Sequence, residues 1–178
     1  MTKPKLGDIF KIPLSDGKMA YGRYLFYSKM GPIIEVFDFI SHGDASMDDL
    51  SLGKLLFPPV ITGLFAALRD HMWNVIGNRR VIDFVQPKFV SASYDRTTGA
   101  VRKWSLWDGE SFTSIGDYLP SEYKELEFLV VWNPINVVRR IETGEMPFPY
   151  ADLIKYNKYT PRPKTDRKKP GKLSKSIP

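Results

Sequence analysis

The chain has 178 residues, of which 43% are hydrophobic and 13% aromatic, enough for the packed core of an ordinary globular domain. It contains no cysteine, which excludes disulfides, thiolate metal sites and cysteine nucleophiles. The formal charge is +6, but residues 158–178 carry eight Lys or Arg side chains against Asp166 alone, and subtracting this +7 leaves −1 on residues 1–157. The body is therefore nearly neutral, and the basic character belongs to its C-terminal end.

This basic end is rich in Pro, Lys and Ser and cannot bury enough apolar area to offset the entropy of ordering it. We expect residues 1–157 to form a single α+β domain and residues 158–178 to be a disordered basic tail. A solubilising extension is favoured over a nucleic-acid arm. No apolar run is long enough to span a bilayer, and the N-terminus leads into a strand without a signal-peptide core, so we expect a cytoplasmic location.

The first elements expected are two strands within residues 7–27, joined by Asp16 and Gly17. An Asp-Gly pair between β-rich runs indicates a hairpin, because both central positions of the matching turn need a positive φ. Gly22 interrupts the return strand, which indicates a bulge that bends a sheet toward a barrel. Residues 32–40 are apolar on both faces and predict a central third strand. We expect a mainly antiparallel, strongly curved and partly barrel-like sheet that begins as a meander.

A polar loop at residues 41–51 then carries Asp44, Asp48 and Asp49. Their spacing lacks the pattern of a calcium loop and its closing glutamate, so no metal site is predicted. The simplest interpretation is a solvated acidic loop. The functional alternative is a docking site for a basic partner.

Residues 60–77 fit both a strand and a helix, because apolar side chains recur at helical spacing while the start is β-branched and follows two prolines. We predict a strand through about Ala66, followed by an irregular turn packed by Trp73. His71 beside Asp70 is predicted to lie on the surface, because neighbours in a chain seldom face each other.

A second hairpin is expected from residues 89–94 and 101–107, which flank a short connection ending in Gly99. Trp104 and Trp107 are three positions apart, so in a strand they point to opposite faces. We expect one in the core and the other exposed or covered by another element.

Residues 126–132 are apolar at every position except Glu127 and predict one central strand. Asn133 followed by Pro134 then predicts the start of a helix, which Gly144 ends, so we expect a C-terminal helix near 134–143. Arg139 and Arg140 fall near its C-terminal end, where they are expected to be solvated and to complement the helix dipole.

Motifs of catalysis are missing from the sequence. It has no P-loop, no dinucleotide fingerprint, no nucleophile elbow and no metal-spaced histidine pair, since its histidines are His42 and His71 alone. Asp8, Glu35 and Asp38 sit in expected strands and are predicted to be exposed or to hydrogen-bond in turns. We predict no catalytic residue, metal or cofactor, and favour binding over catalysis.

The order of these segments resembles the immunity protein 26 family of bacterial polymorphic-toxin systems. The resemblance spans roughly residues 4–142 and is carried by residues 7–14 with 21–23, 34–38, 67–68 with 73–77, 126–127 with 131–134, Val138, Arg140 and Ile141. It implies a cytoplasmic inhibitor that binds a cognate toxin protein and blocks it without chemistry of its own. It offers no catalytic residues, and no counterpart for the basic tail.

Two other functions remain open at this point. The Gly-Asp-Ile start also resembles small SH3-like barrels, including ribonuclease-type toxins, for which Arg23 is the only early candidate; a structural role for this arginine is favoured. A nucleic-acid-binding module could use the basic tail for phosphate contacts, although the near-neutral body argues against it.

The sequence therefore predicts an immunity protein that occludes a toxin's active site. Acidic residues would steer a basic partner and aromatic residues would anchor the contact. The predicted contact residues are Asp44, Asp48 and Asp49, plus whichever of Trp104 or Trp107 faces out.

Overall fold

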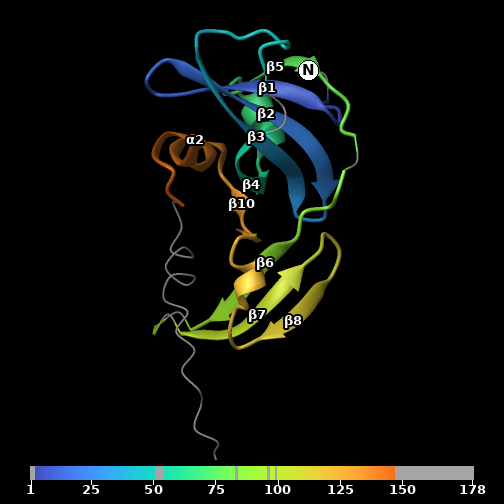
Figure 1. Cartoon of the computed structure of the whole chain (residues 1–178), viewed down its shortest axis with the longest axis vertical. Helices are drawn as coiled ribbons and strands as arrows, with labels where there is room; N and C mark the ends of the chain where they lie inside the picture. Colours follow the sequence, from blue (N-terminus) through green and yellow to red (C-terminus); the bar gives the residue numbers. More distant parts are fainter. Residues whose placement is uncertain (1–2, 51–53, 83, 96, 99, 147–178) are drawn as a thin grey trace, which may run out of the picture.

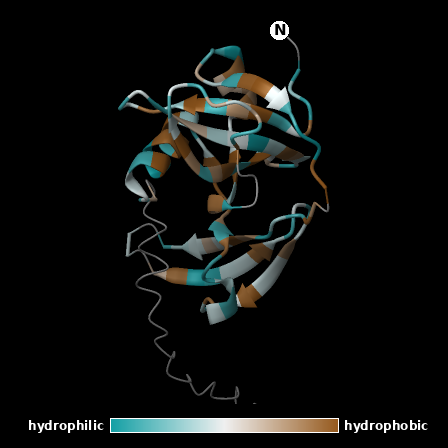
Figure 2. Cartoon of the chain, turned by 45° about the horizontal axis from the view of Figure 1, so that its top comes forward, coloured by the Kyte–Doolittle hydropathy of each residue, from teal (hydrophilic) through white to brown (hydrophobic). Residues whose placement is uncertain are grey.

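The computed structural model describes residues 3–50, 54–82, 84–95, 97–98 and 100–146, which form two β-sheets placed one after the other along the long axis of the molecule (Figure 1). Sheet A has the order β10-β4-β3-β2-β1-β5, and sheet B has the order β8-β7-β6-β9. Both sheets carry hydrophobic segments, brown in Figure 2. The elements are β1 (Asp8–Pro13), β2 (Lys18–Ser28), β3 (Gly31–His42), β4 (Leu55–Thr62), α1 (Leu64–Arg69), β5 (Asn74–Asn78), β6 (Phe89–Tyr94), β7 (Val101–Trp107), β8 (Phe112–Gly116), η1 (Ser121–Tyr123), β9 (Glu127–Phe128), β10 (Val131–Trp132) and α2 (Pro134–Thr143).

Strands β1, β2 and β3 form the expected antiparallel meander. The first turn differs in type from the expected one. Gly17 has a φ of 79°, but Asp16 does not have a positive φ, and the Gly17 N–H donates to the Leu14 carbonyl at 3.2 Å. This is a three-residue loop in which a type I turn is followed by a left-handed glycine.

Curvature of sheet A arises partly at Gly22, where the register between β2 and β3 shifts. A Cβ atom at this position would lie 2.7 Å from the Phe10 ring and 2.8 Å from the Glu35 carbonyl oxygen. The predicted bulge is confirmed. The sheet stays open rather than closing into a barrel, with β10 and β5 at its edges, and the α+β class holds.

The strand predicted through Ala66 ends at Thr62, so the prediction is wrong beyond that residue. The Thr62 hydroxyl donates to the Trp132 carbonyl at 2.9 Å, and the Gly63 N–H donates to the same oxygen at 3.2 Å. These bonds end the strand, and α1 follows because Leu64 and Ala67 are buried in the core at helical spacing. The predicted packing of Trp73 is confirmed, since its ring stacks on Phe10 at 5.3 Å between centroids.

Sheet B contains the predicted second hairpin of β6 and β7, extended by β8, which was not predicted. Trp104 and Trp107 are 0% and 2% exposed. Of the two alternatives expected for the second ring, coverage by another element holds, and neither tryptophan faces out as the predicted contact requires. Trp104 packs with Phe128 on one side of the hairpin. Trp107 packs with Phe89 and with residues of sheet A, including Ile61, on the other. Both faces of β7 are therefore covered at the positions of these two tryptophans.

Residues 126–132 do not form the single central strand predicted from their apolar run. β9 pairs in parallel with β6 of sheet B, whereas β10 pairs in parallel with β4 of sheet A. The chain crosses from one sheet to the other at Leu129 and Val130, as Figure 1 shows between β10 and β6. The run is apolar because it packs into two cores in succession.

Helix α2 is confirmed with its predicted caps. Asn133 Oδ1 accepts from the Ile135 N–H at 3.0 Å, and Gly144 ends the helix with a φ of 70°. The prediction that Arg140 is solvated is wrong. Its side chain is 9% exposed, and its Nη1 lies 2.7 Å from Oε2 of Glu127, which is 2% exposed.

The predicted basic tail and the boundary at residue 157 lie outside the described residues, so the domain prediction stays a prediction. Within the described part of the chain, no helix is long and apolar enough to cross a membrane.

Candidate partner-binding surface

The acidic loop, residues 43–50, lies against one face of sheet A. Its apolar side chains Ala45, Met47 and Leu50 pack with Ile9 and Tyr21 of the sheet. Met47 sits over Gly77 so closely that a Cβ there would lie 2.7 Å from the methionine sulfur. Asp44 directly precedes these anchors, and Asp48 and Asp49 lie between Met47 and Leu50, so the loop is held on the sheet while its carboxylates stay exposed.

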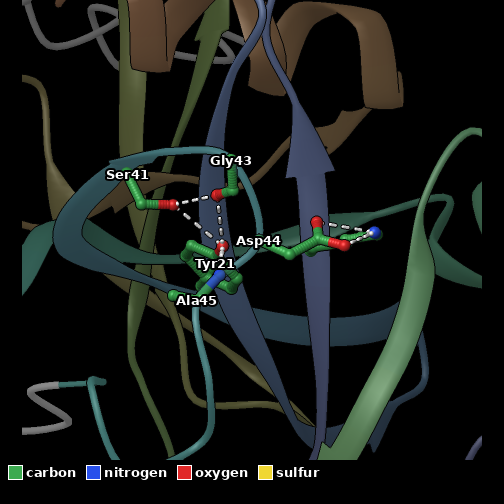
Figure 3. A network of polar contacts seen from close by, with 6 residues as sticks. Tyr21, Ser41, Gly43, Asp44 and Ala45 are labelled. Carbon is green, nitrogen blue, oxygen red and sulfur yellow. Dashed lines mark hydrogen bonds and ion pairs between the residues drawn. The ribbon is translucent and has the colours of Figure 1, made fainter.

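The hydroxyl of Tyr21 organises the start of the loop (Figure 3). It accepts from the Ala45 N–H at 2.8 Å and lies 2.9 Å from the Ser41 hydroxyl oxygen, which in turn donates to the Gly43 carbonyl at 2.6 Å. Gly43 has a φ of 89°, in the left-handed region that suits glycine. A buried ring thus holds the backbone just before and after Asp44.

Each of the three predicted aspartates has a different environment. Asp44 pairs with Lys11 Nζ, at 2.7 Å from Oδ1 and 2.9 Å from Oδ2. Asp49 accepts from the Ser46 hydroxyl at 2.7 Å and the Ser46 N–H at 2.8 Å, and these bonds lower the pKa of Asp49. Asp48 is 99% exposed, with Arg79 Nη2 3.9 Å away.

Charge on this surface is partly offset within the chain. Three carboxylates face the two cations of Lys11 and Arg79, which leaves a formal −1. An exposed ion pair contributes little to stability and can exchange partners at small cost. Asp48, whose carboxylate is the least engaged, is therefore the group most available to a cationic partner.

The two predicted tryptophans do not join this surface. Both belong to β7 of sheet B and are buried, whereas the aspartates belong to the loop on sheet A. The structure brings together Asp44, Asp48 and Asp49 but supplies neither aromatic ring as an exposed anchor.

Lys11, Tyr21 and Arg79 complete the site but were missed as part of it. Lys11 carried a weak signal, because a charged side chain in a half-buried strand needs a partner nearby. Nothing in the sequence indicated that Arg79 would lie beside Asp48, or that the Tyr21 hydroxyl would hold a loop.

Arg23, considered above as a ribonuclease residue, pairs with Glu35 directly across β2 and β3, with Nε 2.6 Å from Oε1. Glu35 is buried, so the prediction that it is an exposed or turn residue is wrong, and burial raises the pKa of its carboxyl against the opposing effect of Arg23. The arginine is committed to this structural pair. Among the described residues, no three His, Asp or Glu side chains gather in a group that could hold a metal.

Comparison with known families gives one match. The family model described as Immunity protein 26 matches residues 5–97, just over half of the chain. The chain belongs to the immunity protein 26 family. The family match covers β1 to β6, including the acidic loop and its Tyr21 and Arg79 anchors, and it ends before the 126–141 segments that also carried the resemblance. No curated protein and no solved structure matches the chain.

Proposed function

We propose that this immunity protein binds a cognate bacterial toxin in the cytoplasm and neutralises it by occluding the toxin's active site, with no catalysis of its own. The observation that carries the proposal is the family match over residues 5–97. A family of immunity proteins is named for protecting against a toxin, and occlusion by a bound protein requires no reacting group on the inhibitor.

The acidic loop is the proposed contact with the toxin. Its backbone is held by Tyr21 and by its packing on sheet A, so little conformational entropy remains to be lost on binding. Asp48 offers a carboxylate at full exposure, and Asp44 and Asp49 flank it. A cationic patch around a toxin's active site would be attracted to this loop and could displace Lys11 and Arg79 from their partners.

Trp104 and Trp107 do not anchor the proposed contact, because both rings are buried and leave no aromatic surface at β7. The binding energy would instead come from the carboxylates and the backbone of the loop.

The experiment is a pull-down from the source cells with the full-length chain as bait, washed at low and then at high salt. A single retained protein that kills cells when expressed alone, and is tolerated when this chain is co-expressed, would support the proposal. Phosphate-driven binding weakens steeply with salt, whereas a packed protein interface is less sensitive. Recovery of nucleic acid alone, lost in the high-salt wash, would refute it and favour a nucleic-acid module that uses the basic tail.

A matched pair of charge-reversal variants tests whether the acidic loop contacts the toxin. Asp48→Lys reverses the charge of the most exposed carboxylate in the loop. Glu110→Lys makes the same change at an exposed position between β7 and β8 of sheet B, whereas the loop packs on sheet A. We expect co-expressed Asp48→Lys to lose protection against the toxin while Glu110→Lys keeps it.

A further inference from the structure

A cavity of about 400 Å³ lies at the β1 and β5 edge of sheet A, beside α1. Apolar side chains line it, together with cations from the N-terminal segment. The principal lining residues are Phe65, Leu68, Trp73, Val75, Lys3 and Lys5. Its volume falls within the range of about 300–1,000 Å³ that is usual for ligand pockets.

The cavity lies on the opposite face of sheet A from the acidic loop. Successive residues of a strand point to opposite faces, and Ile9 packs under the loop while Phe10 packs in the core on the α1 side. Val75 pairs with Phe10 across β1 and β5 and therefore shares the α1 side. The two surfaces are separate, so a molecule bound at one need not cover the other.

The apolar part of the cavity is prebuilt. Trp73 is held by its stacking on Phe10, and Phe65 by ring contacts with Tyr24 and Tyr27 at 5.8 and 5.7 Å between centroids. Val75 keeps about half of its surface exposed, although it belongs to a strand. An incoming apolar side chain would cover this surface without rearranging the rings.

The charge of the cavity is positive because Lys3, Lys5 and Arg69 line it against one carboxylate, that of Asp8. Asp8 Oδ2 accepts from the Lys5 N–H at 2.7 Å, and Asp8 Oδ1 accepts from the Asn78 side chain at 2.7 Å. The ammonium groups of Lys3 and Lys5 form no ion pair with any described residue. Arg69, also in the lining, uses its Nε and Nη2 on Asp70.

We infer that this cavity binds an acidic segment of a partner polypeptide, which places an apolar side chain against Phe65, Leu68 and Val75 and its carboxylates beside Lys3 and Lys5. Apolar walls with two unpaired cations complement an apolar side chain flanked by Asp or Glu. A basic segment would meet like charge, and a fully apolar one would leave the ammonium groups unused. The inference does not depend on toxin neutralisation, and its preference for acidic partners is opposite to that of the acidic loop.

The test is selection from a phage-displayed library of linear decapeptides on the immobilised full-length protein. We expect enrichment of peptides that carry Asp or Glu next to Phe, Leu or Trp. A fluorescein-labelled synthetic copy of the enriched peptide is then titrated by fluorescence anisotropy. Two changes should each weaken its binding about tenfold or more: the double reversal Lys3→Glu with Lys5→Glu, and Val75→Trp, which fills the cavity from a strand position that accepts aromatic residues.

The control is the double reversal Lys103→Glu with Lys124→Glu, at two exposed positions in the half of the molecule that holds sheet B. It changes the net charge equally and should leave the affinity unchanged. Far-UV circular dichroism of each variant confirms that it is folded. Three results would overturn the inference: enrichment of basic peptides, no enrichment at all, or equal weakening by the control and the cavity variants.

Discussion

Replacing Arg140 by methionine should destabilise the protein strongly, because it breaks the buried ion pair between α2 and β9. Arg140 Nη1 lies 2.7 Å from Oε2 of Glu127, whose side chain is 2% exposed. The guanidinium carbon also lies 4.2 Å from the Phe57 ring centroid and 5.1 Å from that of Trp132. Arg140 thus connects the helix beside sheet A to the edge strand of sheet B.

The expected cost follows from what is left behind. Methionine keeps the apolar stem of Arg140 but loses the guanidinium contacts with the Phe57 and Trp132 rings, and the Glu127 carboxylate loses its counter-charge in a buried site. Breaking a buried pair by removing one partner typically costs about 3–5 kcal/mol. Replacing both partners by apolar residues is often nearly neutral, so the double variant Arg140→Met with Glu127→Leu should recover most of the loss.

The pH dependence of stability is a second test of the same ion pair. Burial raises the pKa of Glu127, and Arg140 acts against this rise. A carboxyl with a raised folded pKa binds its proton more tightly in the folded state, so its contribution to stability falls as pH rises from the unfolded value through the folded one. Without Arg140 the pKa of Glu127 should rise further, and the Arg140→Met deficit should be smallest in acid and grow toward neutral pH.

Urea unfolding followed by far-UV circular dichroism and tryptophan fluorescence measures these free energies, and agreement of the two probes tests two-state behaviour. A loss below about 1 kcal/mol for Arg140→Met, or additive effects of the two single changes, would refute the assignment of the pair as a buried connection.

Three further changes test other parts of the fold. Gly22→Ala should cost about 1–3 kcal/mol in urea unfolding, because the new Cβ would lie 2.7 Å from the Phe10 ring; an unchanged midpoint would contradict the close approach at the bulge. His71→Gly should stabilise the protein by about 1 kcal/mol in the same assay, because His71 has a φ of 57°, and a loss of stability would show that its side chain contributes contacts. Ser46→Ala should raise the pKa of Asp49, measured by NMR titration of the carboxyl carbon, and should lessen the stability that Asp49 provides above its ordinary pKa and loses as pH falls; an unmoved pKa would contradict the loop geometry.

Local signals predicted the elements that local interactions determine. The Asn133 and Pro134 start and the Gly144 end of α2 depend on a few neighbouring residues, and the first hairpin depends on a glycine between two β-rich runs. The type of its turn was wrong because loop length, which sets the turn type, depends on where the two strands begin to pair.

Errors arose where distant segments decide the outcome. Residues 126–132 look like one strand until the chain is seen to pair with β6 and then with β4, more than 35 and 65 residues earlier in the sequence. Trp107 is buried by sheet A, and Trp104 is buried by the segment that ends in β9. The alternation of side chains along β7 shows that the two rings point to opposite faces, but it does not show that other segments cover both faces. Arg140 lies near the C-terminal end of α2, as the helix dipole favours. Its burial depends on the ion pair with Glu127 of β9, which the sequence around Arg140 does not reveal.

The candidate site was predicted in part for the same reason. The three aspartates stand in one loop of the sequence, so their proximity needed no long-range information. The pairing of Asp44 with Lys11, the position of Arg79 beside Asp48 and the anchoring by Tyr21 all join residues more than 20 positions apart.

The proposed contact between the acidic loop and the toxin can be tested by a binding measurement. The most direct measurement is the affinity of the purified toxin, once captured, for the wild-type chain and for the Asp48→Lys and Glu110→Lys variants, by isothermal titration calorimetry. We expect Asp48→Lys to weaken binding about tenfold or more and Glu110→Lys to leave it unchanged. Equal affinity of all three proteins would contradict the assignment of the loop as the contact surface.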